Sequence, residues 1–108
     1  MTLNEYQKQA LETSTYGAGY KIIYPALGLT GEAGEVSDKI KKVLRDKDGV
    51  FCEEIKLEIM KEVMDVLWYI AALSNDLGYT LEEGAQMNLD KLASRKARGV
   101  IGGSGDNR

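Results

Sequence analysis

The segment from residue 53 to residue 77 constrains the fold most, because it has helical periodicity over a length that no proline interrupts. Apolar side chains surround most of its circumference: Ile55, Ile59, Met60, Val63, Met64, Val66, Leu67, Trp68, Ile70, Ala71 and Leu73. A helix that is apolar nearly all round is a central one. This pattern predicts either that three other helices surround the segment or that one of its faces is a subunit interface.

Capping signals and breakers delimit three further helices. Capping boxes at Thr2–Glu5 and Thr80–Glu83 begin two of them, and we predict helices over residues 3–14, 26–45, 53–77 and 81–98. The inward side of the last helix is expected to comprise Leu81, Ala85, Leu89, Leu92 and Ala93. Residues 15–25 form an apolar loop that packs on the core or lines a pocket. The fold class is therefore all-α and resembles a four-helix bundle.

Bulk properties exclude several function classes. The net charge of −3 argues against a binder of nucleic acid polymers, and the absence of histidine removes imidazole ligands and bases. Cys52 is the only cysteine, so neither an intrachain disulfide nor a thiolate zinc site is expected. We find no signal peptide and no membrane-spanning pattern, and we expect a cytoplasmic protein.

The chain reads as one domain over residues 1–98 followed by a Gly-rich tail over residues 99–108. Two interpretations of the tail stay open. It is either a disordered terminus or a strap whose backbone amides approach an anion.

Two pairs of carboxylates point to a metal site. Glu32 and Glu35 lie three residues apart in one predicted helix, and Glu62 and Asp65 do so in another, so each pair shares a helical face. Four carboxylates brought together repel one another unless a cation lies between them. Oxygen ligands favour Mg²⁺, Mn²⁺ or Ca²⁺. The alternative for Glu62 and Asp65 is a salt bridge to a lysine.

Glycines recur beside the first acidic pair, at Gly28, Gly31 and Gly34. Each costs a helix roughly 1 kcal/mol relative to alanine, so they require a reason. Close contact between helices and room for a ligand are equally good reasons. Further along the chain, one polar and basic helical face carries Asn88, Lys91, Arg95 and Arg98.

These motifs resemble those of the MazG-like, all-α nucleoside triphosphate pyrophosphohydrolases. The resemblance rests on the two acidic motifs in order, on the stretch from Leu27 to Glu35, and on the later segment from Asn88 to Arg95. It implies Mg²⁺-dependent hydrolysis of (deoxy)nucleoside triphosphates between the α and β phosphates, with Mn²⁺ as a possible substitute. It further implies nucleotide-pool house-cleaning and a homodimer or a homotetramer made of two dimers.

The resemblance also implies roles for individual residues. The metal ligands would be Glu32, Glu35, Glu62 and Asp65, and Glu35 or Glu32 would accept the proton of the attacking water. Lys91, Arg95 and Arg98 would neutralise phosphates, while Tyr69 and Asn88 would contact the nucleoside. Tyr20 and Tyr24 are candidate stacking groups, and Trp68 is interpreted as a core or interface residue.

Other hypotheses for the function differ in the substrate or in the class of protein. A dUTPase-type or phosphoribosyl-ATP-type hydrolase would share the fold and differ only in substrate. A non-catalytic helical dimerisation module, or a nucleotide or metal sensor, would explain the apolar helix without catalysis. A di-iron bundle is disfavoured because such sites normally pair glutamate with histidine.

Overall fold

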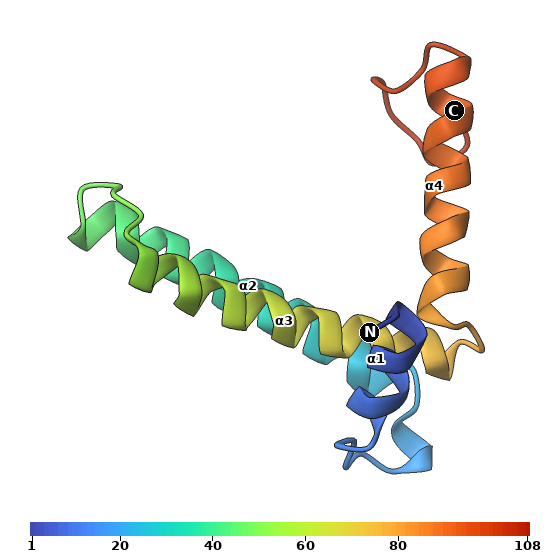
Figure 1. Cartoon of the computed structure of the whole chain (residues 1–108), viewed down its shortest axis with the longest axis horizontal. Helices are drawn as coiled ribbons and strands as arrows, with labels where there is room; N and C mark the ends of the chain where they lie inside the picture. Colours follow the sequence, from blue (N-terminus) through green and yellow to red (C-terminus); the bar gives the residue numbers. More distant parts are fainter.

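The computed structural model describes all 108 residues and contains four α-helices and no strand (Figure 1). The elements are α1 (Leu3–Leu11), the short 3-10 helix η1 (Ala18–Tyr20), α2 (Ile23–Asp46), α3 (Glu53–Asp76) and α4 (Leu81–Ala97). The all-α prediction is confirmed, and the predicted helix ends are displaced by three residues at most. None of the helices combines the length and the apolar character that crossing a membrane requires.

Local sequence explains where the helices begin. Both predicted capping boxes are present, with the Thr2 hydroxyl accepting from the Glu5 backbone N–H and the Thr80 hydroxyl from that of Glu83. The start of α2 lies earlier than predicted, so that Pro25 falls inside its first turn. Proline is tolerated there because the first N–H groups of a helix have no intrahelical acceptor.

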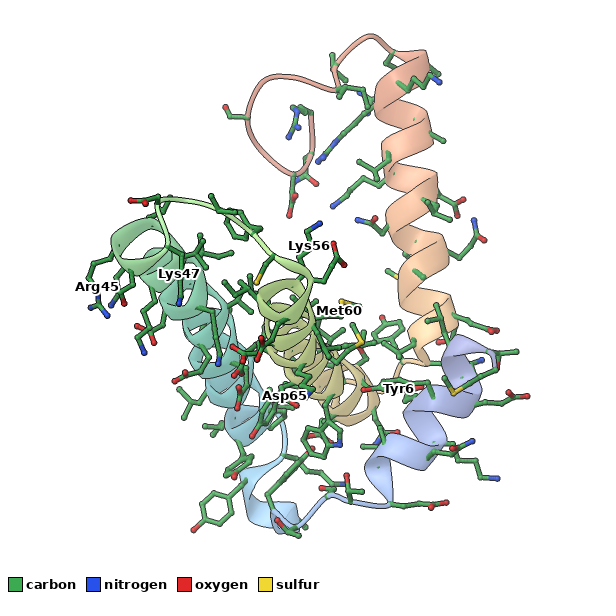
Figure 2. The ribbon with its side chains drawn as sticks, turned by 60° about the vertical axis from the view of Figure 1, so that its left-hand side comes forward. Tyr6, Arg45, Lys47, Lys56, Met60 and Asp65 are labelled. Carbon is green, nitrogen blue, oxygen red and sulfur yellow. The ribbon has the colours of Figure 1, made fainter.

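The long helices α2 and α3 lie side by side as an antiparallel hairpin (Figure 1). Their connection turns through Asp48 and Gly49, both of which have positive φ. Figure 2 shows Arg45 and Lys47 near this connection and Asp65 farther along the hairpin, toward α1. The hairpin therefore provides the rigid platform for the acidic motifs.

The buried side chain of Gln7 joins α1 to the corner between α3 and α4. Its amide nitrogen donates to the carbonyls of Ala71 and Tyr79, at 3.1 and 3.2 Å, and its amide oxygen accepts from the N–H of Leu81 at 3.0 Å. Both functional groups of the glutamine are thus satisfied, although it is among the few buried polar residues. This role of Gln7 was not predicted from the sequence.

The four helices do not close into the predicted bundle within one chain. Instead, α4 projects away from the α2–α3 hairpin (Figure 1), and Leu89, expected to face inward, is 59% exposed. The radius of gyration is 16.8 Å, whereas a compact chain of this length would have about 13 Å. Three helices therefore do not surround α3, and the alternative, that one of its faces is a subunit interface, stays a prediction.

The C-terminal tail curls back beside α4, around the guanidinium of Arg108. This group donates to the carbonyls of Val100, Ile101, Gly102 and Gly105. Backbone carbonyl oxygens of the tail, rather than its backbone N–H groups, thus point toward the positively charged guanidinium of Arg108. Both interpretations of the tail made from the sequence, a disordered terminus and an amide strap that approaches an anion, stay predictions.

Candidate functional site

Three of the four predicted carboxylates meet between α2 and α3. Glu32 projects from α2, while Glu62 and Asp65 project from α3, and one carboxylate oxygen from each lies within 4.8 Å of the others. None of the three forms an ion pair within the chain. The alternative of a salt bridge to lysine is therefore not realised, and the negative charges face one another uncompensated.

The carboxylates differ in their exposure. Glu32 and Glu62 are half-buried, whereas Asp65 is exposed. Burial, followed by the negative charges of Asp65 and the other nearby carboxylates, raises the pKa of the Glu32 carboxyl. The cluster thus has the electrostatic character of a site that a cation would stabilise.

Glu35 lies outside this group of three. It follows Glu32 by one turn of α2 and is exposed, and its charge still contributes to the raised pKa of Glu32. It is therefore near the cluster without contributing an oxygen to it.

The glycines of α2 have two different surroundings. A Cβ on Gly28 would lie 2.5 Å or less from three ring carbons of Tyr69, so this glycine permits close contact between the helices. Gly31 and Gly34 face open space. Close contact between the helices is therefore the reason at Gly28, and room for a ligand beside Gly31 and Gly34 stays a prediction.

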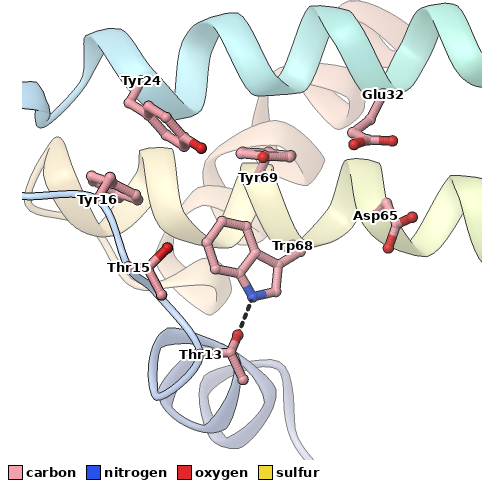
Figure 3. Close-up of a pocket in the computed structure, with 8 residues that line it drawn as sticks. All are labelled: Thr13, Thr15, Tyr16, Tyr24, Glu32, Asp65, Trp68 and Tyr69. Atoms are coloured by element: carbon pink, nitrogen blue, oxygen red, sulfur yellow. Dashed lines mark hydrogen bonds between the residues drawn. The ribbon is translucent and has the colours of Figure 1, made fainter.

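A pocket of about 380 Å³ begins at the carboxylates and extends toward the N-terminal segment (Figure 3). Its lining comprises Thr13, Thr15, Tyr16, Tyr24, Glu32, Asp65, Trp68 and Tyr69. The Tyr16 and Tyr24 rings stack with their centroids 5.0 Å apart, and Tyr24 and Tyr69 are tilted at 6.5 Å. The pocket therefore has an acidic end and an aromatic end.

Trp68 belongs to this pocket, although the sequence suggested only a core or interface role. Its indole N–H donates to the Thr13 hydroxyl at 2.9 Å and to the Ala10 carbonyl at 3.0 Å. Thr13, Thr15 and Tyr16 were not singled out as site residues. The only sequence signal for them was the apolar character of the loop that follows the first helix.

The predicted groups on α4 lie elsewhere in the single chain. Lys91 and Arg95 are 3.7 and 3.6 Å from the Asp106 carboxylate in the tail, and Arg98 donates to the Arg108 main-chain oxygen. Asn88 is exposed on the same helix. Because α4 leads away from the hairpin, the chain does not bring these four residues to the carboxylates (Figure 2).

Of the two candidate stacking tyrosines, only Tyr24 lines the pocket. Tyr20 belongs to η1 and is 64% exposed. Both tyrosines were predicted to lie in one loop, but Tyr24 belongs to α2, and the chain turns between η1 and that helix.

The donor set fits a hard divalent cation. All three candidate ligands, Glu32, Glu62 and Asp65, are carboxylates. Mg²⁺ binds to carboxylates while it retains several waters. With no histidine in the chain and an exposed Cys52 outside the cluster, softer metals find no preferred ligand here.

Comparisons with known proteins agree with this geometry. Residues 25–100 match the MazG nucleotide pyrophosphohydrolase domain. The chain is similar to the Gene 37 protein of Mycobacterium phage L5, with 49% identity over a 114-residue alignment that covers the whole of both chains. No solved structure matches the chain. The matched domain spans most of the sequence, including both acidic motifs, and the chain therefore belongs to the MazG nucleotide pyrophosphohydrolase family.

Proposed function

We propose that this protein hydrolyses (deoxy)nucleoside triphosphates, in the presence of Mg²⁺, to a nucleoside monophosphate and pyrophosphate. The observation that carries the proposal is the cluster of Glu32, Glu62 and Asp65, whose charges have no cationic partner in the chain. Family membership supports the same reaction class. A house-cleaning role in the nucleotide pool follows from this activity.

The carboxylates have separate tasks in this proposal. Glu32, Glu62 and Asp65 would hold Mg²⁺, with Glu35 completing the set. When bound, the cation supplies charge neutralisation at the triphosphate and lowers the pKa of a bound water. Glu35 or Glu32 accepts the proton of the attacking water. Glu35 suits this role because its carboxylate lies beside the cluster rather than within it.

The nucleoside would lie along the pocket that leads away from the carboxylates. Tyr69 separates the acidic end from the aromatic end, where its ring can rest against the sugar (Figure 3). The pocket is open and mixed in polarity, which suits a ligand that carries both an apolar base and charged phosphates.

The remaining groups, Asn88, Lys91, Arg95 and Arg98, would reach the nucleotide from a second copy of the chain. Because α4 leads away from the cluster of its own chain, a partner has to supply this helix. An apolar groove between α2 and α3 offers a surface for that partner, lined by Ile40, Phe51, Ile59, Met60 and Val63 along with Lys56. A homodimer, or a tetramer of two dimers, is the assembly that we expect.

The test is pyrophosphate release from a panel of canonical and modified nucleoside triphosphates, measured with Mg²⁺ and with EDTA. We expect Mg²⁺-dependent release by the wild type and its loss in Asp65→Asn. Glu54→Gln is the matched control, because Glu54 is an exposed acidic residue in the first turn of the same helix. Equal rates in all three proteins would contradict the assignment of the cluster.

A non-catalytic dimerisation module is the second candidate. It is favoured by the exposed apolar side chains of the hairpin, such as Leu57, which is 58% exposed. Mg²⁺ separates the two candidates, since a cation that binds only the folded protein raises its thermal stability. A module without a metal site would show no such increase and no pyrophosphate release.

A further inference from the structure

The aromatic end of the pocket is built largely by residues that precede the family domain. The match to the MazG domain begins at residue 25, whereas Thr13, Thr15, Tyr16 and Tyr24 all come earlier in the chain. Figure 3 shows these four side chains at the end of the pocket opposite Glu32. This wall is therefore formed mainly by the segment that precedes the matched domain.

The wall is anchored to α3 by Asp76. One oxygen of its carboxylate accepts from the Tyr16 hydroxyl and from the Ile22 backbone N–H, both at 2.9 Å. Ile22 has φ 68° and ψ −55°, and the next N–H donates to the Lys21 carbonyl at 2.7 Å, which makes a γ-turn. A β-branched residue with positive φ is strained, and such strain persists only where the surroundings impose it.

The chemistry of this wall suits an uncharged planar ring. Four aromatic side chains surround the space, and no charged side chain lines this end. The Thr13 hydroxyl already donates to the Ala10 carbonyl and accepts from Trp68, whereas the Thr15 hydroxyl has no hydrogen-bond partner within the chain. Because Thr15 is exposed, water meets this hydroxyl, and a ligand in the pocket can replace that water as donor or acceptor.

The distance to the carboxylates suits a nucleotide. Tyr24 and Glu32 are eight residues apart on α2, or about 12 Å along the helix axis. A nucleotide that spans the pocket has its phosphates nearest Glu32 and Asp65, with a cation between the like charges. Its base lies beside the aromatic side chains rather than between Tyr16 and Tyr24, whose rings already stack with centroids 5.0 Å apart.

We propose that Thr15 and Tyr16 determine which nucleobase is accepted. The base stacks at the aromatic end, its edge forms a hydrogen bond with the Thr15 hydroxyl, and Asp76 acts as a positioning residue for Tyr16. The inference rests on the proposed function for the identity of the ligand. It assigns base selection to the segment before the family domain.

The test measures selection by two independent readouts. The first is kcat/KM for pyrophosphate release from nucleoside triphosphates that differ only in the base. The second is the quenching of Trp68, the only tryptophan, by the matching nucleosides in EDTA, which needs neither catalysis nor a cation between phosphate and carboxylates. The variants are Thr15→Val and Tyr16→Ala, and the control is Thr30→Val, whose hydroxyl bonds to carbonyls of its own helix outside the pocket.

We expect Thr15→Val to change the ratio of affinities between the best and the second-best base by about tenfold, the value of one hydrogen bond to a matched group. Tyr16→Ala should weaken the selection further, while Thr30→Val leaves the ratios unchanged. If Thr15→Val and Tyr16→Ala lower all affinities by the same factor, or leave them unchanged, base selection does not lie in this wall.

The two readouts also separate this inference from the proposed reaction. Base-dependent quenching that Thr15→Val alters, in a protein that releases no pyrophosphate, would retain the inference and refute the reaction. Pyrophosphate release with ratios that neither variant changes would retain the reaction and refute the inference. Absence of quenching by every nucleoside would overturn the inference.

Discussion

Replacing Gly28 by alanine tests whether close packing against Tyr69 holds the two long helices together. A Cβ at this position would meet three carbons of the Tyr69 ring at 2.5 Å or less, inside any real carbon–carbon contact. The ring cannot remain where it is, so it must rotate into the pocket or the helices must separate. Gly31 and Gly34, on the same helix, would place a Cβ in open space.

The magnitude follows from two opposing effects. An alanine in place of a glycine within a helix stabilises it by about 1 kcal/mol, and this gain is common to all three positions. Overpacking a tight contact costs about 1–3 kcal/mol, and only Gly28→Ala incurs it. We therefore expect Gly28→Ala to have a free energy of unfolding about 1–3 kcal/mol lower than that of Gly31→Ala or Gly34→Ala.

The assay is urea unfolding of the three variants and the wild type in EDTA, so that metal binding does not contribute. Trp68 reports the transition, because its indole packs against the Tyr69 ring with centroids 5.0 Å apart. Equal stabilisation of all three variants would refute the close contact. Equal destabilisation of all three would show that a surface absent from the single chain covers Gly31 and Gly34.

Three further predictions concern the corner, the cluster and the tail. Gln7→Leu leaves the Leu81 N–H without its hydrogen-bond acceptor and should lower the free energy of unfolding by about 1–3 kcal/mol. Gln9→Leu, at an exposed position of the same helix, should change that free energy little, and urea titration measures both variants. The raised pKa of Glu32 means that the folded, metal-free protein binds this proton more tightly than the unfolded chain, so this group favours folding less as pH rises through the folded pKa. Mg²⁺ should consequently raise the melting temperature more at about pH 8 than at about pH 5, and a pH-independent rise in a calorimetric scan would contradict this. Arg108→Ala removes the donor that holds the tail carbonyls and should expose residues 99–107 to a protease of broad specificity, with the melting temperature unchanged.

The sequence predicted the elements because their signals are local. Capping boxes at Thr2 and Thr80, and a glycine that follows each long apolar run, set helix ends that agree with the structure to within a turn. Three members of the acidic cluster were also predictable, whereas the fourth predicted carboxylate, Glu35, lies outside it. Two residues at i and i+3 share a helical face whatever the rest of the fold does, so only the pairing of two helices had to be assumed.

The direction of α4 was not predictable, because it depends on a corner rather than on the helix itself. Gln7 fixes that corner, and a glutamine in an amphipathic helix ordinarily indicates the solvated face. Its position midway between Leu3 and Leu11, four residues from each, was the available signal for burial. The pocket wall around Thr15 was not predicted either, because an irregular segment has no periodicity that indicates where its side chains point.

The contact at Gly28 also bears on how the carboxylates come together. Four residues forward on α2 from Gly28 is Glu32, and four residues back on α3 from Tyr69 is Asp65, so the tight contact and the acidic pair occupy successive turns of one antiparallel register. Lys39 and Glu58, 3.7 Å apart, continue the same register toward the hairpin turn. The packing of Gly28 on Tyr69 lies on one side of the repelling carboxylates along the helices, and the Lys39–Glu58 ion pair lies on the other side. The helices cannot relieve that repulsion by sliding apart without losing the packing at Tyr69. Either a proton, whose binding the raised pKa of Glu32 favours, or a cation therefore reduces it.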